Sequence, residues 1–131
     1  MKISIDMIFL SLLVSFIPIQ VGADIRKDCR KQTGVSWNSL NKLKAGNFVQ
    51  KDPKLKCYLK CFMQKNGIFG KNDIDVEKAL RHLPPGLQVK SRKTLERCRK
   101  IPTRGSCDKA FQLARCFFTI QPEVLSSVPF V

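Results

Sequence analysis

Residues 54–61 read KLKCYLKC, and this stretch decides the fold. Leu55 and Leu59 recur at helical spacing, and Cys57 and Cys61 lie four residues apart. Residues four apart in an α-helix share one face, so both sulfurs point to the same side. The stretch therefore predicts a helix over residues 55–63 that is joined covalently to its neighbours.

The chain begins with a pattern typical of a secretory signal peptide. Lys2 precedes an apolar run over residues 7–19, and a Val-Gly-Ala sequence that ends at Ala23 offers the small side chains that signal peptidase prefers. The run is shorter than the ~20 apolar residues of a membrane span. We expect residues 1–23 to be removed as a signal peptide, and residues 24–131 to be secreted to the extracellular space as one small domain.

All six cysteines belong to this expected mature chain, at Cys29, Cys57, Cys61, Cys98, Cys107 and Cys116. An even number of cysteines in a short exported protein indicates a disulfide framework. Zinc is the weaker interpretation, because no cysteine pair has only two residues between its members and His82 is the single histidine. We therefore expect neither a metal nor another cofactor.

The remaining segments also predict short helices. Glycine and proline residues divide the chain into short pieces, and none of them alternates apolar and polar residues as a strand does. Helical patterns cover residues 74–83, with Asp73 or Asp75 as the N-cap, and residues 86–101. A last helix follows Ser106, which is a good N-cap. The pattern as a whole predicts an all-α fold.

Cys107 and Cys116 lie nine residues apart on this last helix. At ~100° per residue they face opposite sides of it, so each must bond to a different neighbouring helix. Six cysteines allow fifteen pairings, and the spacing alone leaves the choice among them open.

The cysteine spacing resembles that of the insect odorant-binding proteins, in their six-cysteine general and pheromone-binding type. The gaps between successive cysteines are 27, 3, 36, 8 and 8 residues. KQTGVS at residues 31–36, KLKCYLKC at residues 54–61 and CDKAF at residues 107–111 carry the same resemblance, which covers nearly all of residues 24–131.

This resemblance implies about six short helices around an apolar cavity, held by interlocked disulfides Cys29–Cys61, Cys57–Cys107 and Cys98–Cys116. It also implies a carrier of small hydrophobic ligands in sensory fluid, such as odorants, pheromones or fatty-acid-like molecules. An olfactory receptor is a further expected partner, and the protein is expected to be a monomer or weak homodimer. We expect no enzyme activity, because a single histidine and scattered acidic residues leave no nucleophile with a partner.

Inward-facing helical positions, together with the pocket positions of the family, predict the ligand-binding residues. They are Phe62, Met63, Val76, Ala79, Leu83, Thr94, Leu95, Phe111, Ala114, Phe117 and Phe130. For each of them ordinary core packing is the alternative, since core and cavity share one periodicity. His82 is open to two interpretations, a part of a pH response or an exposed helix position.

Residues 117–131 form a C-terminal segment with one charged side chain and many apolar ones, which cannot comfortably stay in water. The resemblance implies a lid over the cavity, and packing against the outside of the fold is the alternative. It further implies a latch in which the terminal carboxylate of Val131 accepts a hydrogen bond from Tyr58. Acid would loosen this latch by protonating the carboxylate.

A net charge of +14 sets this chain apart from the many acidic members of that family. Nucleic acid is not an expected partner of an exported protein, whereas anionic surfaces are. Basic residues recur on one side of the 86–101 helix, namely Lys90, Lys93, Arg97, Lys100 and Arg104, as a solvated face or a docking surface. The alternative function is therefore a binder of anionic polymers or lipids on the same fold, with peripheral membrane contact.

Overall fold

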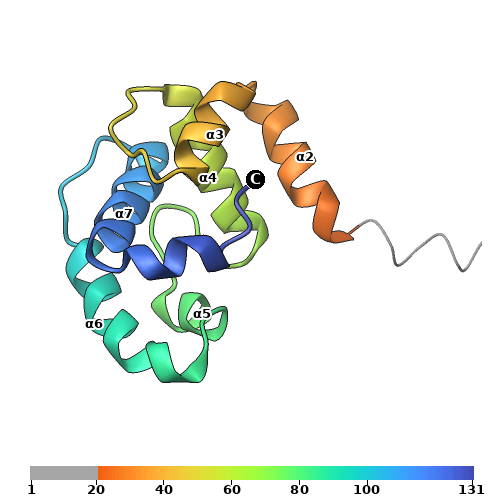
Figure 1. Ribbon diagram of the computed structural model, residues 1–131. Coiled ribbons are helices and arrows are strands. Elements are labelled where there is room, and N and C mark those ends of the chain that lie inside the picture. The colour runs from red at the N-terminus through yellow and green to blue at the C-terminus, as the bar shows by residue number, and fades with distance from the viewer. Residues whose placement is uncertain (1–20) are drawn as a thin grey trace, which may run out of the picture.

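The computed structural model describes residues 21–131, with side chains from residue 25 onward (Figure 1). These residues form six α-helices, α2 (Val21–Thr33), α3 (Trp37–Lys44), α4 (Pro53–Lys65), α5 (Val76–Arg81), α6 (Gln88–Cys98) and α7 (Ser106–Ile120), and two 3₁₀ helices, η1 (Pro85–Leu87) and η2 (Pro122–Ser127). The predicted all-α class and number of helices are confirmed.

Most of the predicted signal peptide, residues 1–20, lies outside the described part of the chain, and residues 21–23 belong to the first turn of α2. Cleavage after Ala23 therefore stays a prediction. Between residues 21 and 131, no helix combines the length and the apolar character needed to cross a membrane.

Local chemistry sets the ends of the helices. The Asp52 carboxylate caps α4 by accepting a hydrogen bond from the Lys54 backbone N–H at 2.9 Å. Asp75, one of the two predicted caps, accepts from the Lys78 N–H at the start of α5. Gly34 ends α2 with a φ of 68°, a conformation that glycine adopts without a Cβ clash.

The N-cap predicted for α7 was wrong. Ser106 is the first residue of this helix, and Gly105 precedes it without a side-chain cap. Asp108 compensates from the first turn, where its carboxylate accepts the backbone N–H of Arg104 at 3.0 Å. A carboxylate in the first turn also suits the positive end of the helix dipole.

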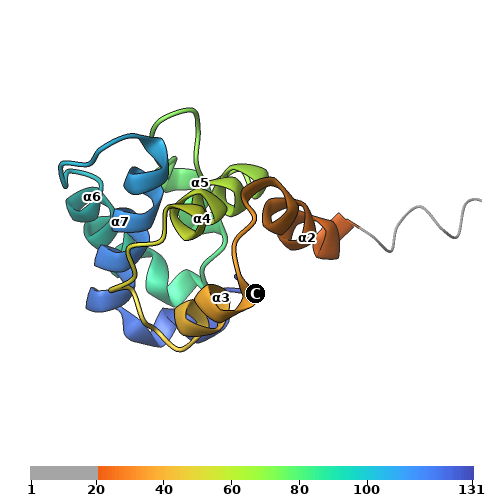
Figure 2. The same ribbon diagram turned by 90° about the horizontal axis from the view of Figure 1, so that it is seen from above.

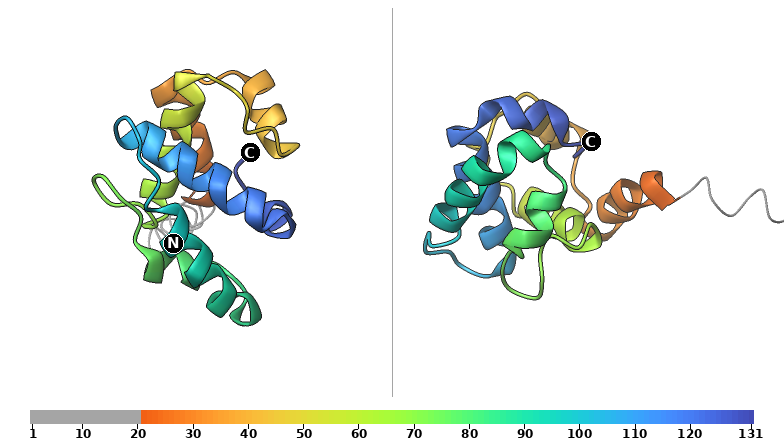
Figure 3. Two further views of the ribbon diagram at one scale, coloured as in Figure 1. Left: turned by 90° about the vertical axis from the view of Figure 1, so that its left-hand side faces the viewer. Right: turned by 90° about the horizontal axis from the view of Figure 1, so that it is seen from below.

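Helices α4 and α7 form the centre of the fold, with α2 packed on α4 and α6 packed on α7. Figure 3 (left) shows α7 crossing the middle of the molecule with α6 below it. Tyr58 and Leu59 from α4 and Phe111 from α7 are almost completely buried between these elements. The amphipathic faces that the sequence predicted for α4 and α7 therefore meet each other.

The three disulfides join Cys29 to Cys61, Cys57 to Cys107 and Cys98 to Cys116, so the predicted pairing is confirmed. The opposite faces of α7 bond to two different helices, as the nine-residue spacing required: Cys107 to α4 and Cys116 to α6. The third disulfide, Cys29–Cys61, holds α2 against α4, which is one of the two central helices.

Helix α7 continues to Ile120 and so includes the first four residues, 117–120, of the predicted C-terminal segment. Phe117 and Phe118 are buried on the helical stripe that α7 already presents to the core, so the helix has no reason to end at Cys116. The segment that follows it covers residues 121–131 and begins with η2, which packs on α7.

Candidate functional site

A cavity of about 190 Å³ lies between α4, α5, α6, α7 and the C-terminal segment 121–131. Eight of the eleven predicted ligand-binding residues line its wall, namely Phe62, Met63, Ala79, Leu83, Leu95, Ala114, Phe117 and Phe130. Their contact with a ligand stays a prediction, but the structure brings these eight side chains together around one hollow.

Three predicted residues are buried elsewhere and do not line the cavity. The Phe111 ring packs against Phe48, with 6.2 Å between the ring centroids. The Thr94 hydroxyl donates a hydrogen bond to the carbonyl of Lys90 within α6, at 3.2 Å. Val76 is buried in the first turn of α5. Helical periodicity selects the inward face, and it does not separate core packing from the cavity wall.

Ten further residues complete the wall, namely Asn66, Ile68, Ile74, His82, Leu113, Phe118, Val124, Ser127, Val128 and Pro129. Phe118 lies on the apolar stripe of α7 but was not predicted to bind ligand, and Leu113 lies beside that stripe, so a broader stripe would have included it. The others come from turns and from the C-terminal segment, where no periodicity marks an inward side.

His82 lies at the C-cap of α5, where its side chain is exposed and also borders the cavity. One of the two sequence interpretations, an exposed position, agrees with this environment, and the place beside the cavity was not predicted. Its part in a pH response stays a prediction.

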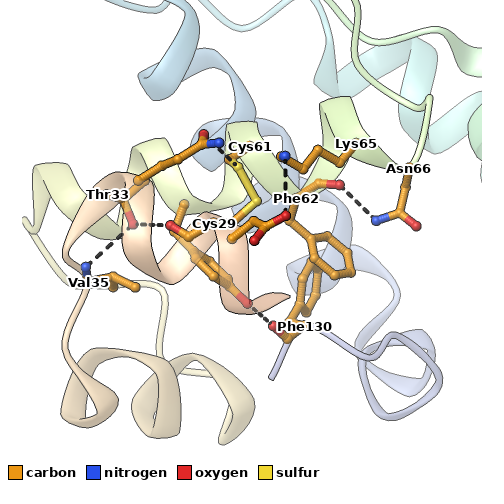
Figure 4. Close-up of a disulfide and its surroundings, with 11 residues drawn as sticks. Cys29, Thr33, Val35, Cys61, Phe62, Lys65, Asn66 and Phe130 are labelled. Atoms are coloured by element: carbon orange, nitrogen blue, oxygen red, sulfur yellow. Dashed lines mark hydrogen bonds and ion pairs between the residues drawn. A yellow bond between two sulfur atoms is a disulfide. The ribbon is translucent and has the colours of Figure 1, made fainter. Parts of the chain in front are cut away.

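The C-terminal segment supplies the buried Phe130 side chain to the cavity wall. Its ring lies 5.2 Å from that of Phe62 and 5.5 Å from that of Phe118, and only 4% of the residue is exposed. Figure 4 shows the Phe62 and Phe130 rings next to each other. Because aromatic pairs at such distances attract each other, these contacts hold the segment over the hollow.

The latch that was predicted between Tyr58 and the terminal carboxylate of Val131 has a different hydrogen-bond acceptor in the structure. The Tyr58 hydroxyl donates its hydrogen bond to the carbonyl of Phe130, and the main-chain oxygen of Val131 accepts from Arg26 Nη1 at 2.7 Å (Figure 4, for the Phe130 contact). Insertion of the Phe130 ring between Phe62 and Phe118 brings the Phe130 carbonyl, and not the following residue, to Tyr58. The hydrogen bond from Tyr58 therefore holds in place the residue whose ring forms part of the cavity wall.

Burial raises the pKa of the Tyr58 hydroxyl, against the opposing effect of the Arg30 and Arg26 charges. A raised pKa keeps this hydroxyl protonated, and so able to donate, throughout the physiological pH range. The contact between Tyr58 and Phe130 consequently does not depend on an acidic group.

The wall is suited to an apolar guest. Among its few polar side chains, Asn66 already donates a hydrogen bond to the Phe62 carbonyl at 2.8 Å. An apolar cavity of ~150 Å³ is known to hold a benzene-sized molecule, so this one has room for a small guest even with Phe130 in place. In the described part of the chain, no three His, Cys, Asp or Glu side chains are grouped as metal ligands.

Comparison with known proteins identifies relatives over most of the chain. It is 25% identical over 126 residues to general odorant-binding protein 69a of Drosophila melanogaster, an alignment that covers 86% of this chain and 85% of that protein. Among solved structures it resembles the Locusta migratoria odorant-binding protein lmigOBP1, with 27% identity and a TM-score of 0.67 over 79% of this chain and 80% of that one.

A second solved structure that this chain resembles is that of the fatty acid binding protein OBP56a from the oral disk of the blowfly Phormia regina. It has 26% identity and a TM-score of 0.64, over 77% of this chain and 89% of that one. Residues 19–120 also match the sequence profile of the PBP/GOBP family. With its three disulfides, its helical fold and its apolar cavity, the chain belongs to the PBP/GOBP family.

Proposed function

We propose that the protein is a secreted carrier that holds small apolar molecules non-covalently. The main support for this proposal is an apolar cavity of about 190 Å³, to whose wall the C-terminal segment contributes the buried Phe130. Burial of apolar surface contributes ~25 cal/mol per Å², so a guest that fills the hollow gains affinity without any covalent chemistry.

The expected ligands are odorant-, pheromone- or fatty-acid-like molecules. Two relatives support this class by name, a general odorant-binding protein and a fatty acid binding protein. Sensory fluid as the site of action, delivery to an olfactory receptor, a non-enzymatic role and a monomer or weak homodimer belong to the same proposal. Removal of residues 1–23 belongs to it as well, and mass spectrometry of the protein secreted from insect cells tests that point.

A binding experiment with a cavity-filling variant tests the function. Ala79 lies on the wall and is buried, whereas Ala45 is exposed at the end of α3. We expect Ala79→Phe to weaken binding of the fluorescent apolar probe N-phenyl-1-naphthylamine at least about tenfold, because the new ring occupies the space of the guest.

The matched control is Ala45→Phe, which adds the same side chain outside the cavity and should bind the probe as the original protein does. Circular dichroism and thermal unfolding show that both variants are folded. Unchanged probe affinity in folded Ala79→Phe would contradict the proposal, and so would failure of volatile alcohols, esters and aldehydes to displace the probe from the original protein.

A further inference from the structure

Trp37 is the single tryptophan of the chain, and it takes no part in the core. It begins α3, whose buried residues are Ser39, Leu40 and Leu43, while Trp37 itself remains 56% exposed. A tryptophan side chain exposed to this extent is unusual, because it leaves a large apolar surface in water.

One basic side chain lies on this indole, and two others belong to the neighbouring ends of α2 and α4. The Arg30 guanidinium lies over the Trp37 ring, 4.6 Å from its centroid. Lys54 reaches over the turn between α2 and α3, where a Cβ atom on Gly34 would lie 3.9 Å from its Nζ atom. Lys31, next to Arg30, is exposed in the last turn of α2. We refer to Arg30, Lys31, Trp37 and Lys54 together as the Trp37 patch.

The arrangement of the helices brings these residues to one edge. In Figure 1 the end of α2 and the starts of α3 and α4 meet at the top of the molecule, and Figure 2 looks down on this edge. None of the four patch residues belongs to the cavity wall. A partner seated on the Trp37 patch therefore leaves the cavity wall uncovered.

The charge of this region is not neutralised. Residues 25–54 hold eight Lys and Arg but only two acidic residues, Asp28 and Asp52. Asp52 is engaged by the Ser39 hydroxyl and the Lys54 backbone N–H, and Asp28 lies 3.9 Å from Lys65. Among the side chains of residues 25–131, none forms an ion pair with Arg30, Lys31 or Lys54.

Two cations of α6 differ in this respect, whereas Lys93 and Arg97 also form no ion pair with the side chains of residues 25–131. Lys90 pairs with Glu123 at 3.5 Å, and Arg92 pairs with Glu77, so part of the charge on that helix is neutralised. No aromatic ring accompanies the exposed Lys93 on α6 or the exposed Lys100 in the turn that follows this helix. The basic face that the sequence singled out thus carries no aromatic ring, and its exposed apolar neighbour on α6 is the smaller side chain of Val89.

From this combination we infer that the Trp37 patch docks the protein on an anionic phospholipid surface. Basic side chains near such a surface attract the lipid phosphates, and tryptophan prefers the interface between headgroups and acyl chains. An anionic polysaccharide would need only the cations, whereas the exposed indole in their midst favours a lipid interface. The inference goes beyond ligand carriage, because it places the carrier at a membrane while its cavity remains free to bind.

The position of the single tryptophan makes the test direct. The protein secreted from insect cells, with its N-terminus determined by mass spectrometry, is titrated with vesicles of phosphatidylcholine alone or with about one third phosphatidylglycerol. We expect the Trp37 emission to shift to the blue and to become protected from acrylamide with the anionic vesicles only. Added salt should reverse the shift, because it screens the exposed cations.

A pair of matched variants separates the patch from general charge. Arg30→Gln with Lys54→Gln removes two cations of the patch, and Lys93→Gln with Lys100→Gln removes one from α6 and one from the turn after it. Each cation close to an anionic bilayer strengthens binding about fivefold, so the first variant should bind about 25-fold more weakly and the second much less so.

Three results would overturn the inference. They are an emission spectrum that anionic vesicles leave unchanged, equal weakening of vesicle binding by the two double variants, and vesicle binding that Trp37→Ala leaves intact in a co-sedimentation assay. Binding to heparin without a change in Trp37 emission, together with no binding to vesicles, would assign the positive charge to a polymer instead. Probe binding in the cavity is measured in parallel, so that failure here is distinguishable from failure of the carrier function.

Discussion

Replacement of Phe130 by alanine should convert a slowly exchanging carrier into a rapidly exchanging one. The Phe130 residue is 4% exposed and its ring contacts those of Phe62 and Phe118. Burial of a phenylalanine side chain contributes ~1.5–3 kcal/mol, and each aromatic pair adds ~0.5–1.5 kcal/mol. Docking of residues 121–131 should therefore weaken by about 3–5 kcal/mol, the range measured for buried Phe→Ala changes.

The consequence for a bound ligand follows from this free energy. Each ~1.4 kcal/mol changes an equilibrium tenfold, so the undocked fraction of the segment should rise by about two to three and a half powers of ten. If the guest leaves past Phe130, its dissociation rate should rise in proportion. Stopped-flow displacement of a preloaded fluorescent probe measures this rate, and thermal unfolding reports the remaining stability.

Phe48→Ala is the matched control. Phe48 is also buried, and its ring also contacts two others, those of Phe111 and Phe118, but it does not line the cavity. Its truncation should lower the free energy of unfolding and leave the dissociation rate nearly unchanged. A Phe130→Ala dissociation rate within about twofold of the original, or equal to that of Phe48→Ala, would refute the reasoning that residues 121–131 act as a lid on the ligand.

Two further predictions concern stability. Replacing both cysteines of the Cys57–Cys107 bridge by serine should cost roughly 1 kcal/mol more than the same change in the α6–α7 bridge, because their separations in sequence are 50 and 18 residues and the longer loop restricts the unfolded chain more. Urea unfolding of the two variants measures the difference, and the reverse order would contradict the reasoning. The hydrogen bond from the Ser39 hydroxyl, at 2.7 Å, is the largest factor that holds the pKa of Asp52 below its usual value. Because the pKa of Asp52 is lower in the folded protein than in the unfolded chain, the ionised carboxylate stabilises the fold fully at pH values above the unfolded pKa of ~3.9. This contribution is lost as the pH falls through the folded pKa. Asp52→Asn should thus destabilise the protein at neutral pH and cease to matter in acid, whereas a pH-independent difference in urea unfolding would exclude the ionic contribution.

The candidate site was only partly predictable, and α7 shows why. Ala114 and Phe117 were predicted to line the cavity and do so, yet Phe111, on the same stripe, packs into the core against Phe48. The hydrophobic effect depends on the area removed from water and not on which apolar neighbour removes it. Helical periodicity therefore carries no information on whether an inward side chain meets another side chain or a void.

The sequence by itself determined the all-helical class, through its periodicity and punctuation, and the covalent framework, through the cysteine spacing and the resemblance that it carries. Both are local or pairwise properties of the chain. Tertiary structure alone decided that Tyr58 meets the carbonyl of Phe130, and that Trp37 stays outside the core beneath Arg30. Such contacts join residues from separate segments, and their partners depend on how α2, α3, α4 and the last eleven residues pack against one another.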